Sequence, residues 1–197
     1  MTDFLLAIGT AKGLFLARSS DGIRWHISDL HLPMNGVYAV AIDARTGSPR
    51  VLVSAESSHW GPSVMRSDDL GETWDEPDEG AICFPADSGA SLERVWSLAP
   101  SPSEPGVVWA GSQPSALFRS EDGGEHFDLV RALWDHPQRP EWGAGFGGQA
   151  IHTVLPHPSD PSRIMVAMST GGVYRSHDAG GSWTAANTGV KAYFLPD

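Results

Sequence analysis

Short apolar segments alternate with turn-forming residues along most of this sequence. Three times, two such segments follow each other across a turn that is dense in Pro, Ser, Gly and Asp. Apolar runs of roughly four to eight residues bounded by such turns predict β-strands. The predicted pairs cover residues 37–42 and 50–55, 95–99 and 107–111, and 151–155 and 164–168.

The second strand of these pairs is apolar at successive positions. Residues 107–110 read VVWA, and residues 164–168 read IMVAM. Such a strand must be covered on both faces, whereas a strand with one wet face alternates apolar and polar side chains. The pattern therefore predicts small sheets that stack face to face on neighbouring sheets.

A repeated segment follows each pair of strands, and a further copy lies nearer the N-terminus. Each copy begins with Arg-Ser and ends with an aromatic residue. The copies read RSSDGIRW (18–25), RSDDLGETW (66–74), RSEDGGEHF (119–127) and RSHDAGGSW (175–183). The closing aromatic residues Trp25, Trp74, Phe127 and Trp183 lie 49, 53 and 56 residues apart.

The residue types in the repeated segment suit a hairpin turn. An aspartate can accept hydrogen bonds from backbone N–H groups of its own turn, and a glycine adopts a positive φ without strain. The closing aromatic residue brings a large apolar area into the next strand. We therefore interpret the segment as a structural turn and not as an active site.

Two strands before the turn, one entering it and one leaving it make a four-stranded unit of about 50 residues, the size of a β-propeller blade. We predict an all-β fold, a β-propeller of four-stranded antiparallel blades with about four blades present. The 197 residues are expected to form one domain, with repeats at about 4–30, 36–80, 92–133 and 149–190. The 22 glycines and 15 prolines, spread along the chain, favour the same class because many short strands need many turns.

The repeated segment resembles the Asp-box signature Ser-x-Asp-x-Gly-x-Thr-Trp of BNR-repeat propellers, which include sialidases, xyloglucan-cleaving glycosidases, photosystem II assembly factors and sortilin-type receptors. The first copy is one residue shorter than the signature, and the third has His126 and Phe127 in place of Thr and Trp. Outside the turns, residues 61–64 (GPSV), 133–142 (LWDHPQRPEW) and 147–152 (GGQAIH) are similar to the bacterial sialidase-like group of BNR-repeat glycosyl hydrolases. The resemblance implies a propeller related in fold to glycosidases.

Closed propellers have roughly four to eight blades, and closure removes exposed sheet edges. Residues 4–17 supply only the strands just before the first turn, so the first blade lacks an inner strand. We expect the sequence to be the N-terminal half of a propeller, with open edges that favour self-association. The alternative is a four-bladed closure in which residues 193–196 complete the first blade.

The net charge and the composition disfavour several classes of binding partner. A net charge of −11 disfavours nucleic acid and anionic membrane, and four of the thirteen Lys and Arg residues occupy the repeated Arg position of the turns. No segment reaches the ~20 apolar residues of a membrane span. The single Cys83 is expected to be a buried small apolar side chain, and we expect a cytoplasmic protein without a cofactor.

The longest link between repeats, residues 133–152, concentrates chemically versatile side chains. Aromatic rings beside an arginine and carboxylates suit a polyhydroxylated ligand, and long loops often carry function. The predicted ligand-binding residues in it are Trp134, His136, Arg139, Trp142 and His152. The alternative interpretation is a plug that packs over the channel and binds nothing.

A second group of candidates lies in the insertion between the second strand and the second turn and at the start of the next repeat. It contains Glu56, His59, Trp60, Arg94 and Trp96, which are expected to face the same channel mouth or to be ordinary loop and core residues. The histidines match no metal-ligand spacing, so no metal is predicted.

We expect a non-catalytic binding or scaffold module that takes a protein partner or a small polar or carbohydrate ligand at the channel mouth. The alternative is a glycoside hydrolase, which needs paired carboxyl groups, or in sialidases a tyrosine nucleophile and arginines. The sialidase Arg-Ile-Pro element is absent, and none of the three tyrosines lies in a recognisable nucleophile setting. The acid or base candidates for this alternative are Glu56, Glu93, Asp135 and Glu141.

Overall fold

The computed structural model describes residues 4–45, 47–77, 80–145 and 147–190, and these residues form four antiparallel sheets. The first sheet contains β1 (Phe4–Thr10), β2 (Gly13–Ser19) and β3 (His26–Ile27). The second contains β4 (Asn35–Asp43), β5 (Arg50–Ser57) and β6 (Gly61–Ser67). The third contains β7 (Arg94–Pro100), β8 (Val108–Gln113), β9 (Ala116–Ser120) and β10 (Asp128–Leu129). The fourth contains β11 (Ile151–Pro156), β12 (Ile164–Met168), β13 (Gly172–Ser176) and β14 (Thr184–Ala185).

Strands of each sheet pair in chain order, as the predicted hairpins require. The third and fourth sheets have the predicted four strands, but the first and second have three. In the second sheet a single bridge between Arg66 and Asp75 takes the place of the outer strand. In the first sheet β1 corresponds to the second strand of the later sheets, because Leu5 pairs with Arg18 as Leu52 pairs with Arg66. The first sheet therefore lacks an inner strand among the described residues.

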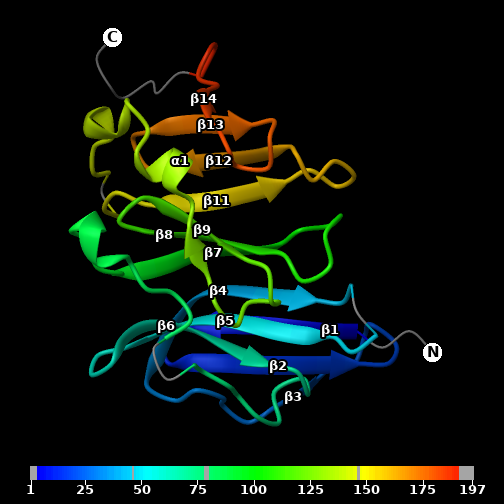
Figure 1. Cartoon of the computed structure of the whole chain (residues 1–197). Coiled ribbons are helices and arrows are strands. Elements are labelled where there is room, and N and C mark those ends of the chain that lie inside the picture. The colour runs from blue at the N-terminus through cyan, green and yellow to red at the C-terminus, as the bar shows by residue number, and fades with distance from the viewer. Residues whose placement is uncertain (1–3, 46, 78–79, 146, 191–197) are drawn as a thin grey trace.

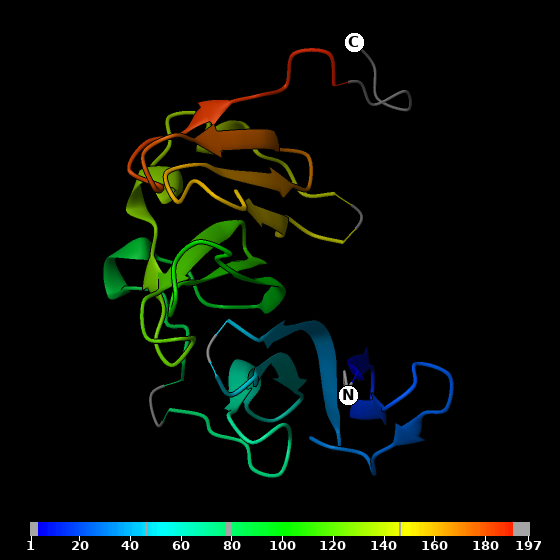
Figure 2. The same cartoon turned by 90° about the vertical axis from the view of Figure 1, so that its right-hand side faces the viewer.

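The four sheets follow one another as blades of a partial β-propeller, from the N-terminal sheet at the bottom to the C-terminal sheet at the top (Figure 1). The inner strands β4, β7 and β11 pack beside one another, and β1 packs beside β4. Turned by 90°, the described part is an open arc with its first and fourth sheets at opposite ends (Figure 2). The predicted fold class is confirmed, and the alternative closure by residues 193–196 lies outside the described residues.

Side chains from facing sheets fill the spaces between blades. The second strands β5 and β8 are buried on both faces, as their continuous apolar pattern predicted, and Val51, Leu52 and Val53 are inaccessible. In β12 the prediction is wrong for one face, because Met165 is 41% exposed. Val51 and Val53 point to one side of β5 and pack with the first sheet, whereas Leu52 points to the other side and packs with the third sheet. The blades are therefore held together by interleaved apolar side chains, which is the largest favourable contribution in such folds.

Four Ser-x-Asp turns, residues 19–25, 67–74, 120–127 and 176–183, close the hairpins. In the second turn the Ser67 hydroxyl donates to Asp69 Oδ1 (2.8 Å) and accepts from the Gly71 N–H (2.7 Å). Asp69 also accepts from the backbone N–H and the hydroxyl of Thr73 (2.9 and 2.6 Å). The fourth turn repeats these bonds with Ser182 in place of Thr73. The predicted structural role of the aspartate is confirmed.

These hydrogen bonds stabilise the ionised aspartates. The bonds from the Thr73 side chain and backbone lower the pKa of Asp69 from 3.8 to about 2, and those from Ser182 and Ser176 lower the pKa of Asp178 to about 2. Backbone N–H groups of Arg24 and Ile23 do the same for Asp21. Burial raises the pKa of Asp122, but the hydrogen bonds from His126, Ser120 and Glu125 outweigh it and bring it to about 2.

Helical structure is limited to η1 (Ala86–Ser88), α1 (Arg131–Trp134) and η2 (Arg139–Glu141) in the part of the chain described. None of these helices is long or apolar enough to cross a membrane. Cys83 was predicted to be buried, and this is wrong. Its side chain is exposed, because it lies in the irregular segment before η1 and not in a strand between two blades.

Candidate functional site

Three inner strands carry a β-bulge at the same position of the repeat. The register shifts at Tyr38 in β4, at Trp96 in β7 and at His152 in β11. A bulge inserts one unpaired residue and re-aims its side chain, and bulges are frequent beside binding sites. Each of these inner strands thus presents one aromatic or imidazole ring near its N-terminal end.

Arg94 joins the rings of the second and third sheets. Its guanidinium lies 4.0 Å from the centre of the Tyr38 ring and 5.1 Å from that of Trp96, and the two rings meet edge to face at 5.5 Å. Arg94 also donates two hydrogen bonds to Glu56, at 2.6 and 3.0 Å. The hydrogen bonds from Arg94 to Glu56 raise the pKa of Arg94, so the guanidinium stays charged.

A chain of hydrogen bonds extends this group along β7. The Trp96 indole N–H donates to Gln113 Oε1 (3.1 Å), and the Gln113 amide donates to Glu93 Oε2 (2.8 Å). Two carboxylates, Glu56 of the second sheet and Glu93 just before β7, are therefore held near Arg94 by side chains of the third sheet. We call Tyr38, Glu56, Glu93, Arg94, Trp96 and Gln113 the Arg94 cluster.

The other residues predicted for this region are more exposed. His59 and Trp60 lie in the β5–β6 turn, where their backbone N–H groups donate to the Ser57 hydroxyl. The Trp60 residue is 92% accessible. His152 is exposed and its Nδ1 lies 3.0 Å from the Thr153 hydroxyl. All lie at the same end of their sheets, since Asn35 pairs with Ser57, Arg94 with Gln113 and Ile151 with Met168.

The long link between the third and fourth sheets forms a packed cluster. Arg139 lies 3.4 Å from the centre of the Trp134 ring and 5.5 Å from that of Trp142, and donates a 2.6 Å hydrogen bond to the Ser115 carbonyl. Only 9% of Trp134 and 6% of Trp142 is accessible. Burial lowers the pKa of Arg139 from its ordinary value, although the charge of Asp135 opposes the shift.

Tyr174 of β13 ties this link to the fourth sheet. The Trp142 indole N–H donates to the Tyr174 hydroxyl (2.9 Å), which donates to Gln138 Oε1 (3.0 Å). His136 stacks on Trp142 at 6.2 Å and meets the Tyr174 ring edge to face at 5.0 Å. We call Trp134, His136, Gln138, Arg139, Trp142 and Tyr174 the Arg139 cluster. Its rings face one another, which is the arrangement expected of a plug.

The structure gathers part of the predicted site residues into these two clusters, whereas His59, Trp60 and His152 belong to neither. Asp135 and Glu141 flank the Arg139 cluster on the exposed side, and no hydrogen bond joins either side chain to another described residue. Sequence reasoning missed Tyr38 and Gln113. The repeat contained a signal for Tyr38, because it occupies the position of Trp96 and His152, whereas Gln113 is found only through its contact with Glu93.

Within residues 4–45, 47–77, 80–145 and 147–190, no three His, Cys, Asp or Glu side chains are grouped to hold a metal ion. The candidate site is therefore a surface of rings, one guanidinium and two carboxylates. Such a surface can cover the C–H faces of a polar molecule with rings and bind its hydroxyl groups with charged side chains.

No protein-family model matches the sequence, and no curated protein matches it. Solved structures are similar in fold. The GH74 xyloglucanase from Xanthomonas campestris is 22% identical with a TM-score of 0.64, over 95% of this chain and 29% of that one. The GH74 enzyme of Niastella koreensis is 19% identical with a TM-score of 0.57, over 90% and 27%. YCF48 from Cyanidioschyzon merolae is 15% identical with a TM-score of 0.55, over 91% and 52%.

These similarities support the β-propeller fold, which glycoside hydrolases share. At identities of 15–22% they bear on the fold alone. The chain spans between about a quarter and a half of the length of these structures.

Proposed function

We propose that this chain is an Asp-box repeat propeller of the BNR type that acts as a binding module without catalysis. Its ligand is a neutral, polyhydroxylated molecule of the carbohydrate class, and the binding surface is the Arg94 cluster at the mouth of the channel. The carrying observation is the recurrence of a bulged ring, Tyr38, Trp96 and His152, on three successive inner strands.

Several contacts support a role in binding. Tyr38 remains 42% accessible, although Arg94 lies over its ring, so a ligand can reach it. Glu56 accepts both hydrogen bonds from Arg94, which fix the orientation of its carboxylate. Preorganised polar groups beside an open ring are what a site needs to fix the orientation of a sugar.

Isothermal titration with neutral oligosaccharides tests this function, and xyloglucan fragments are the first choice because two structures of similar fold are GH74 enzymes, one of them described as a xyloglucanase. We expect Trp96→Ala to weaken binding at least tenfold, about 1.4 kcal/mol, through lost ring contact. Trp25→Ala is the matched control, because Trp25 is a partly exposed indole on the first sheet, away from the cluster. Equal affinities of the two variants would contradict the proposal.

Glycoside hydrolysis is the second candidate. It is favoured by one observation, the placement of Glu56 and Glu93 around the same arginine. A hydrolase should release the fluorophore from aryl glycosides and lose this activity in Glu93→Gln, with Glu141→Gln as control. If the chain binds oligosaccharides but releases no product, the binding module remains the better description.

A further inference from the structure

The three junctions between successive blades share a glycine turn that lies on an apolar side chain, which comes from β2 in the first sheet and from the second strands β5 and β8 in the next two. At each junction the glycine of a Ser-x-Asp turn lies on an apolar side chain of the preceding sheet: Gly71 on Leu16, Gly124 on Leu52 and Gly180 on Trp109. A Cβ atom at Gly124 would lie 2.8 Å from Leu52 Cδ2, so only glycine allows this approach.

Arginines of the preceding sheet complete two of these junctions. Arg18 donates to the carbonyl of Leu70 (2.8 Å), and Arg50 donates to the carbonyl of Gly123 (2.8 Å). Both carbonyls belong to the residue just before the turn glycine. A junction therefore has two halves: an apolar side chain with arginines on the preceding sheet, and a glycine turn on the following sheet.

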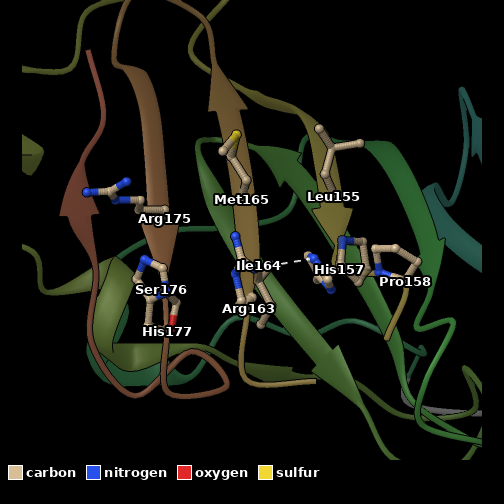
Figure 3. Close-up of a pocket in the computed structure, with 10 residues that line it drawn as sticks. Leu155, His157, Pro158, Arg163, Ile164, Met165, Arg175, Ser176 and His177 are labelled. Carbon is tan, nitrogen blue, oxygen red and sulfur yellow. Dashed lines mark hydrogen bonds between the residues drawn. The ribbon is translucent and has the colours of Figure 1, made fainter. Parts of the chain in front are cut away.

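The fourth sheet carries the preceding half of a junction. Met165 pairs with Leu155 and Arg175, just as Trp109 pairs with Ala99 and Arg119 in the third sheet. These side chains surround an open pocket of about 270 Å³ that also contains Arg163, His157 and His177 (Figure 3).

No described turn packs on this pocket. The exposed fractions of Leu155 and Met165 are 56% and 41%, whereas Trp109 at the corresponding position is 1% exposed. Arg175 forms no hydrogen bond or ion pair with any described residue, although its counterparts Arg18 and Arg66 bond to the next turn.

The first sheet carries the following half. By the pairing with β2, Phe4 and Leu6 occupy the positions of Val51 and Val53 in the second sheet, which face the preceding blade and are fully buried. Phe4 and Leu6 are instead 44% and 48% exposed. The turn beside them is built as in the other blades, with the Gly22 N–H bound to the Ser19 hydroxyl at 2.8 Å.

We propose that two copies of this chain associate head to tail, with the first sheet of each copy seated on the fourth sheet of the other. The described residues hold one unmatched preceding half and one unmatched following half, and a second copy can supply what each face lacks. The four described sheets of two copies add up to eight, within the roughly four to eight blades of closed propellers. A heterologous contact of this kind closes into a ring when its rotation allows, and closure covers the open sheet edges.

The contacts expected across this interface follow from the internal junctions. The Gly22 turn of one copy lies on Met165 of the other, and Arg163 and Arg175 donate to carbonyls of that turn. Phe4 and Leu6 pack against Leu155 and Met165, which removes exposed apolar area from water on both faces. The ring also encloses the channel, so that the Arg94 clusters of both copies line one mouth.

Light scattering during size exclusion tests the proposal with two interface variants. The wild-type chain is expected to elute at twice the monomer mass. Met165→Asp destroys the fourth-sheet face, and Leu6→Asp destroys the first-sheet face, so each variant alone is expected to be a monomer. An equimolar mixture of the two is expected to form a dimer, because one intact pair of faces remains.

The mixture also separates this arrangement from others. Pairing of two fourth-sheet faces would leave Leu6→Asp dimeric, and pairing of two first-sheet faces would leave Met165→Asp dimeric; either result overturns the proposal. Recovery of the dimer in the mixture shows that both variants fold. Met34→Asp, at an 88% exposed position in the loop that joins the first and second sheets, is the matched control and should remain dimeric. A wild-type chain that stays monomeric at every concentration also overturns the proposal and assigns the two faces to other blades.

Discussion

Two groups of similar make-up, each an arginine in contact with two aromatic rings, differ in environment. Arg94 contacts Tyr38 and Trp96 and is bound by Glu56, which raises its pKa. Arg139 contacts Trp134 and Trp142 and is bound by a backbone carbonyl in a buried cluster, where burial lowers its pKa.

The difference teaches that residue type alone does not separate a binding surface from a plug. What separates them is the direction in which the rings point. A bulge turns Tyr38 out of its strand, whereas Trp134 packs in the core shared by the second and third sheets and Trp142 packs in the core shared by the third and fourth sheets. The first group keeps part of its ring surface exposed, and the second buries its ring surface between blades.

The largest contrast in the free energy of unfolding is expected between the variants Trp142→Ala and Tyr38→Ala. Loss of the buried Trp142 removes its packing and its hydrogen bond to Tyr174, and the free energy of unfolding is expected to fall by about 3–5 kcal/mol. Tyr38→Ala should cost about 1 kcal/mol or less, because the ring is partly exposed. Urea unfolding at equilibrium measures both. Equal losses would remove the distinction between plug and surface.

The stability losses of Arg139→Ala and Arg94→Ala compare the two clusters at their guanidinium groups. We expect Arg139→Ala to lower the free energy of unfolding by about 2 kcal/mol, because the ring contact is lost and the Ser115 carbonyl is left without its donor. Arg94→Ala should cost about 1 kcal/mol or less, since its ion pair with Glu56 is partly exposed. Arg139→Lys is a useful addition, because a lysine does not restore the planar stacking. A larger loss at Arg94 would contradict the assignment.

Acid titration should show the smallest difference between the two clusters. The turn aspartates Asp69 and Asp178 have a pKa near 3.8 when unfolded and about 2 when folded, so their stabilisation is complete above pH 4 and is lost as the pH falls towards 2. These aspartates lie outside both clusters. Trp142→Ala and Tyr38→Ala should therefore lose stability with the same slope over this range. Asp178→Asn should flatten the slope, and an unchanged slope in that variant would contradict the role of the turns.

Most of the fold was predictable because its signals are local. A Ser-x-Asp turn forms its hydrogen bonds within eight or nine residues, so its sequence predicts its structure, even in the shortened first copy with Asp21 and Gly22. The continuous apolar pattern likewise predicted burial on both faces, which holds for β5 and β8 but not for β12, where Met165 is exposed. The missing outer strand of the second sheet was not predictable from the repeat, and among the described residues after Trp74, Asp75 alone forms a bridge to that sheet.

The site was predicted only in part. The residue types around Arg94 and Arg139 were recognised, and the structure gathers them into two clusters. Their ligand-binding roles stay predictions. The pairings of Glu56 with Arg94 and of Glu93 with Gln113 join residues 38 and 20 positions apart, across sheets or strands, and no local pattern encodes such distances.

Local sequence thus decides the repeat, the strand order within each blade and the turn chemistry, because these depend on interactions between near neighbours in the chain. Only the packed structure decides which rings are buried and which faces remain uncovered. Trp109 is sealed by the turn of the next blade, while Met165, at the same position one blade later, is exposed. The two differ because burial depends on what the neighbouring blade places against a side chain, and that is a property of the assembled arc.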